Sequence, residues 1–296
     1  MVMEILRKKT MIRNQLLVII FLLMIGIFYA CEKEANVKIP ETEPKPVLVC
    51  FISPEDSLIR VSLTNSIPLY TSNANNYPYE INNAIITISN GNLSKKIPWF
   101  KDSIGYQIST SLFPIIAGET YSIEVDIPDG RKLNAKTKVP YESFPLFDFT
   151  IDKNLIDSNE FGVNYEFIYT LSWTDLPAVT NYYRGVIYNL TSDTNLGVDK
   201  SAQQLNEIFE SDQGKDGGTI KITGQGSIFY TPGSIPNSSS NYIAYLIMSN
   251  KEYFEYHKDL YYNNDGNPFS EAKINFSNIE GGIGCFSAYR MVKKRF

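Results

Sequence analysis

Short apolar runs separated by turn residues restrict the fold of this chain more than any other feature. Between residues 47 and 140 such runs recur about every 8–12 residues, which is the spacing of strands in a small β-sandwich. Tyr121–Asp126 alternates strictly between apolar and polar residues, as a strand with one buried face does. Asn90-Gly91 and Asp129-Gly130 are tight-turn dipeptides between runs. We therefore predict a mainly β fold.

Seven strands are predicted in this first region. Val47–Ile52 is apolar throughout, so we expect it to be a central strand with both faces covered. The other six are predicted over residues 58–64, 84–89, 93–97, 105–110, 121–126 and 132–139.

A second β-rich region begins after the Pro-containing segment at 140–148. The segment from Leu171 to Val186 resembles the B and C strands of a fibronectin type III sandwich, in which the indole of Trp173 would fill the core beside a tyrosine. Further strands are predicted over 165–173, 182–190, 219–229 and 242–248, and helical spacing predicts helices over Ser201–Ser211 and Lys251–Tyr262.

Together these patterns predict two β-sandwich domains of the immunoglobulin or fibronectin III kind. The expected domains are 47–140 and 141–296, the second with one or two short helices.

The N-terminus has the features of a lipoprotein signal peptide, predicted over residues 1–30. Arg7, Lys8, Lys9 and Arg13 precede the uncharged run Leu16–Tyr29, and Ala30 precedes Cys31. The run is shorter than the roughly 20 residues that a membrane-spanning helix needs, although a retained anchor is the alternative. Cys31 would carry the lipid and become the mature N-terminus. Met11 also opens a normal basic segment, so translation could start there instead of at Met1.

Residues 31–46 are rich in Pro, Glu and Lys, and this composition predicts a flexible tether. Without residues 1–30, the chain has 23 basic and 31 acidic residues. This acidic excess argues against nucleic acid or an anionic lipid surface as a partner.

The remaining cysteines and the histidine offer little chemistry. Cys50 and Cys285 lie in apolar contexts, which fits either buried free thiols or a disulfide. His257 is the only histidine, which excludes a zinc site with several imidazoles. On the apolar side of its predicted helix, it is favoured as a packed residue over a general base.

Two loops have the oxygen ligands and glycines of a calcium loop, residues 212–218 and 263–267. Neither has the full spacing, so ordinary turns are favoured. No nucleotide-binding or hydrolase motif is present. We therefore expect no catalytic residues, no metal and no cofactor, and we do not expect an enzyme.

Several segments in order along the chain resemble the DUF4249 family of Bacteroidetes outer-membrane lipoproteins of unknown function. They are Cys31–Glu34 with its tether, 47–54, 84–91, 117–121, 267–270 and Ser277–Phe286, the last being the most specific. The resemblance implies a lipid-anchored outer-membrane protein, often considered alongside TonB-dependent receptors, with no established catalytic residues. Cys285 stands where relatives more often have an aliphatic or aromatic residue. Whether the protein faces outward or toward the periplasm stays open.

Asp56-Ser57-Leu58 and Asp102-Ser103-Ile104 resemble the O-glycosylation acceptor of exported proteins in these bacteria, which makes Ser57 and Ser103 candidate modified residues. The leading functional hypothesis is a lipid-anchored protein that binds a ligand or a receptor. Binding would fall to the aromatic segment Tyr70–Tyr79 or to the Tyr253–Tyr262 face, unless those tyrosines are core residues. The alternatives are a surface adhesin or structural lipoprotein, and a carboxylate-dependent glycan hydrolase.

Overall fold

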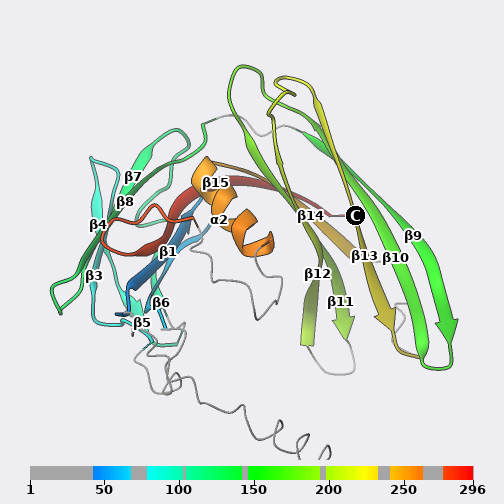
Figure 1. Ribbon diagram of the computed structural model, residues 1–296, viewed down its shortest axis with the longest axis horizontal. Helices are drawn as coiled ribbons and strands as arrows, with labels where there is room; N and C mark the ends of the chain where they lie inside the picture. Colours follow the sequence, from blue (N-terminus) through cyan, green and yellow to red (C-terminus); the bar gives the residue numbers. More distant parts are fainter. Residues whose placement is uncertain are drawn as a thin grey trace, which may run out of the picture. The chain divides into compact units, whose positions relative to one another are not determined.

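The computed structural model describes residues 43–67, 79–102, 105–141, 146–193, 198–232, 241–262 and 276–295. All of them belong to one compact unit, Glu43–Phe296. The fold is mainly β, as predicted, and the described part has one helix, α2 (Lys251–Tyr262) (Figure 1).

An eight-stranded sheet runs through both halves of this unit. Its strands lie in the order β12-β11-β14-β15-β1-β2-β6-β5. Their bounds are β12 Val198–Ser211, β11 Tyr182–Asp193, β14 Asn241–Ser249, β15 Ile283–Arg295, β1 Pro46–Ile52, β2 Leu58–Asn65, β6 Gly105–Ser109 and β5 Trp99–Phe100. The central position predicted for residues 47–52 is confirmed, because β1 pairs with β15 on one side and β2 on the other.

The first hydrophobic core lies between one end of the long sheet and a four-stranded sheet. That second sheet has the order β4-β3-β7-β8, formed by Ser94–Ile97, Ile85–Ser89, Thr120–Asp126 and Lys132–Lys138. Period-two alternation buries Tyr121, Ile123 and Val125 of β7, as predicted. The same core includes Phe286 and Ala288 from the far end of the chain.

The second core lies under a three-stranded sheet of order β13-β10-β9, formed by Thr219–Tyr230, Gly162–Thr174 and Phe147–Asn159. Trp173 of β10 is buried there, and its ring meets Tyr183 of β11 edge-on with centroids 4.8 Å apart. The indole and its tyrosine neighbour thus pack as the resemblance to a fibronectin type III segment predicts. Because β10 and β11 lie in different sheets, this ring pair joins the two sheets across the core.

β15 takes part in both halves of the unit. Its residues 283–288 pair in parallel with β1, and its residues 289–295 pair antiparallel with β14. At the start of the second stretch, Arg290 Nε donates to Glu55 Oε1 at 2.6 Å and the Tyr289 hydroxyl donates to Asp56 Oδ2 at 2.7 Å. The turn between β1 and β2 is therefore fastened to the strand where it passes from one core to the other.

The start of β15 is held by the side chain of Asn278 and lies unusually close to the backbone of β1. Asn278 accepts a hydrogen bond from Phe286 N at 3.0 Å and donates one to Phe286 O at 2.8 Å, imitating a strand partner. Gly284 has φ +120°, and a Cβ there would lie 2.0 Å from the carbonyl oxygen of Leu48. Glycine is required because it alone permits both this φ and this approach.

The helix predicted over Ser201–Ser211 is wrong, because these residues belong to strand β12. β12 pairs with β11 along its length, but the register shifts between Ile187–Asn206 and Tyr188–Gln204. This irregularity leaves Leu205 without an opposite residue, so Leu205 and Ile208 both pack against the second core although they are three residues apart. A helix-like spacing thus arises from a bulged strand.

The helix predicted over Lys251–Tyr262 is confirmed with the same bounds. Asn250 caps it, since its Oδ1 accepts a hydrogen bond from the backbone N–H of Tyr253 at 3.1 Å. The short strand β5 and the long strands β9 and β15 have no counterpart among the predicted strands.

Replacing Gly284 with alanine should destabilise the protein by about 3 kcal/mol, lowering the melting temperature by roughly 10 °C, because the new methyl group meets Leu48 O. Gly130→Ala is the matched control: Gly130 also has positive φ (+96°), but a Cβ added there would have nothing within 4 Å. We expect Gly130→Ala to lower the free energy of unfolding by about 1 kcal/mol. Equal losses, measured by thermal unfolding, would contradict the close-approach explanation.

Candidate functional site

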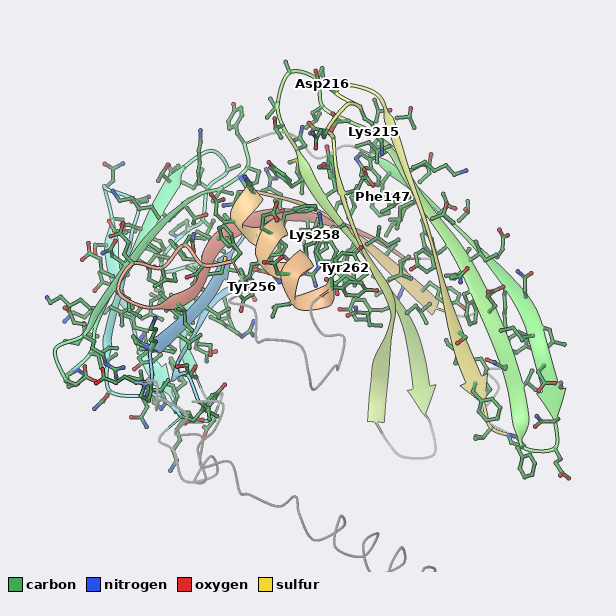
Figure 2. The ribbon with its side chains drawn as sticks, viewed as in Figure 1. Phe147, Lys215, Asp216, Tyr256, Lys258 and Tyr262 are labelled. Atoms are coloured by element: carbon green, nitrogen blue, oxygen red, sulfur yellow. The ribbon has the colours of Figure 1, made fainter. Side chains whose placement is uncertain are left out.

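Helix α2 lies on the face of the long sheet opposite the second core. On β14, Ala244, Leu246 and Met248 belong to that core, whereas Ile247 points the other way and packs with Tyr253 of α2. Figure 2 labels Tyr256, Lys258 and Tyr262 on this helix. The surface around α2 is the first candidate site.

A largely buried arginine, Arg184, forms the centre of this surface. Arg184 Nε binds Glu207 Oε1 at 2.6 Å, and its Nη1 donates to the Tyr253 hydroxyl at 2.5 Å. The side chains of Arg184 and Glu207 are only 16% and 11% exposed. Gln204 extends the network by donating to Glu207 Oε2 at 3.1 Å. The ion pair orients the guanidinium on the sheet, and its hydrogen bond to Tyr253 fastens the first turn of the helix there.

His257 is a packed residue, as the sequence favours. Its ring lies 4.0 Å from that of Tyr253 and 4.7 Å from that of Phe51, centroid to centroid. Nδ1 is 2.9 Å from the backbone oxygen of Tyr253, so Nδ1 carries the proton and donates. Burial, assisted by the positive charge of Arg184, lowers the pKa of His257 to about 3. The imidazole is therefore neutral at physiological pH.

The expected binding face Tyr253–Tyr262 divides into two parts. Tyr253 and Phe254 are buried, which fits the core alternative. Leu260, Tyr261 and Tyr262 are 43%, 42% and 59% exposed, and both tyrosines lie beside the ring of Phe209 from β12. The other candidate segment, Tyr70–Tyr79, lies outside the described residues except for Tyr79, which is 52% exposed.

A second cluster joins two loops at one end of the second core. The carboxylates of Asp175, Asp212 and Asp216 place one oxygen each within 4.8 Å of one another, and the first two residues are buried. Figure 2 labels Asp216 and Lys215 at this end. The sequence pattern indicates the loop 212–218 as a candidate but not Asp175, which follows β10 and is distant from that loop in the sequence.

These carboxylates have oxygens of the kind that Ca²⁺ takes as ligands. Each, however, also holds a loop in place. Asp175 accepts from the Tyr183 hydroxyl at 2.6 Å and from Gly217 N at 3.1 Å. Asp212 accepts from Asn181 N at 2.8 Å, and Asp216 accepts from Ala178 N at 2.7 Å. The hydrogen bonds join the 175–181 loop to the 212–218 loop and account for the cluster as loop closure.

Both remaining thiols are free and buried. Cys50 belongs to the first core, whereas Cys285 Sγ points to the opposite face, 3.7 Å from the backbone oxygen of Glu252 in α2. Adjacent strands therefore place the two sulfurs on different faces of the sheet. Burial raises the pKa of both thiols, that of Cys285 to about 12.

The other candidate residues are only partly within the described part of the chain. Ser57 is exposed in the turn before β2. Ser103 and the lipidation candidate Cys31 lie outside the described residues. Among the residues that are described, no helix has the length and apolar character needed to cross a membrane.

The neutral state of His257 can be measured directly, because the chain has a single histidine. In an untagged protein, the imidazole Hε1 resonance should stay unchanged from pH 8 to pH 5, since its folded pKa is about 3. The unfolded state, with its ordinary pKa, takes up a proton as the pH falls below about 6.5, so His257 makes the fold less stable toward acid. A resonance that titrates with a midpoint near 6.5 would contradict the packing described above.

Comparison with known proteins places the whole described unit in one family. No curated protein matches the chain. The family model described as domain of unknown function (DUF4249) matches residues 32–295, which includes every described strand and the helix. The chain therefore belongs to the DUF4249 family.

Proposed function

We propose that this protein is a lipid-anchored outer-membrane protein that binds a ligand or a receptor, working alongside a TonB-dependent receptor, and does not transform what it binds. The exposed aromatic end of α2 carries the proposal. Leu260, Tyr261 and Tyr262 present large side chains to solvent on a helix that the Arg184–Tyr253 hydrogen bond fastens to the sheet. Tyrosines on a helix that is fixed in position give contact area at low entropic cost.

The anchor is proposed from Cys31 and the charged, Pro-rich residues after it. β1 begins at Pro46, so at most about 50 Å of extended tether would separate the lipid from the folded unit. Such a tether would keep the aromatic surface close to other proteins of the same membrane. The match to the DUF4249 family model starts at residue 32, directly after Cys31, which fits a mature chain that begins at Cys31.

The arrangement of the acidic cluster argues against its use as a glycosidase site. A glycosidase needs one carboxyl group as acid and another as nucleophile or base on either side of the bond to be cleaved. Asp175, Asp212 and Asp216 instead converge on one point and accept hydrogen bonds from loop backbone. These carboxylates hold the two loops in place.

Lipidation should depend on Cys31 alone. In cells fed an alkyne fatty acid, Cys31→Ser should abolish labelling of the protein and release it from the outer-membrane fraction. Cys50→Ser and Cys285→Ser are matched controls that should keep both the label and the location, because these thiols are buried. Label retained by the Cys31→Ser variant would contradict the proposed anchor.

The binding role predicts a partner that depends on the end of α2. The native lipoprotein, isolated from gently cross-linked outer membranes, should enrich the same receptor reproducibly. The double variant Tyr261→Ser and Tyr262→Ser should lower that enrichment about tenfold or more, because exposed aromatic anchors dominate interfaces.

Tyr141→Ser is the control for this experiment, since Tyr141 is 74% exposed and lies outside the helix. Its enrichment should equal that of the unchanged protein. Failure to find any reproducible receptor, or equal loss in the control, would count against the proposed role of α2.

A further inference from the structure

We draw no further inference here: the strongest candidate, the cluster of the Asp175, Asp212 and Asp216 carboxylates between two loops at one end of the second core, carries nothing because each carboxylate accepts a hydrogen bond that closes those loops, and no second observation in the described part of the chain points to a bound ion.

Discussion

The pairing of β15 with two different strands holds this structure together. Where β15 runs parallel to β1, its Phe286 and Ala288 complete the first core. Where it runs antiparallel to β14, it extends the sheet that covers the second core, and its Val292 packs against that core. The strand can enter beside β1 only because Gly284 lets its backbone approach Leu48. Each core therefore depends on residues from the last part of the chain.

The candidate surface follows from the same pairing. Asn250, the cap of α2, donates its backbone N–H to Ala288 O at 3.2 Å, and Cys285 lies under the first turn of the helix. β15 thus positions the helix, and Arg184 holds its first turn through the Tyr253 hydroxyl, while Tyr261 and Tyr262 at its other end are partly exposed.

The sequence predicted most of what local patterns control. Alternation located β7 and β10, the apolar run located β1 as a central strand, and Asn250 marked the start of α2. The bulge in β12 was not predictable in this way, because the irregularity at Leu205 gives a strand the spacing of a helix. Long-range contacts were not predictable either: the approach of Asp175 to Asp212 depends on how two loops close over the core. Lipidation at Cys31 and modification at Ser57 and Ser103 stay predictions.

Hydrogen exchange of the native protein tests most directly whether β15 makes the two cores one cooperative unit. Peptides from β7 in the first core and from β10 in the second should share the same opening free energy for their slowest amides, equal to the free energy of global unfolding. Slowest amides that open at clearly different free energies in the two peptides would show that the cores unfold separately, which would contradict the dependence of both on β15.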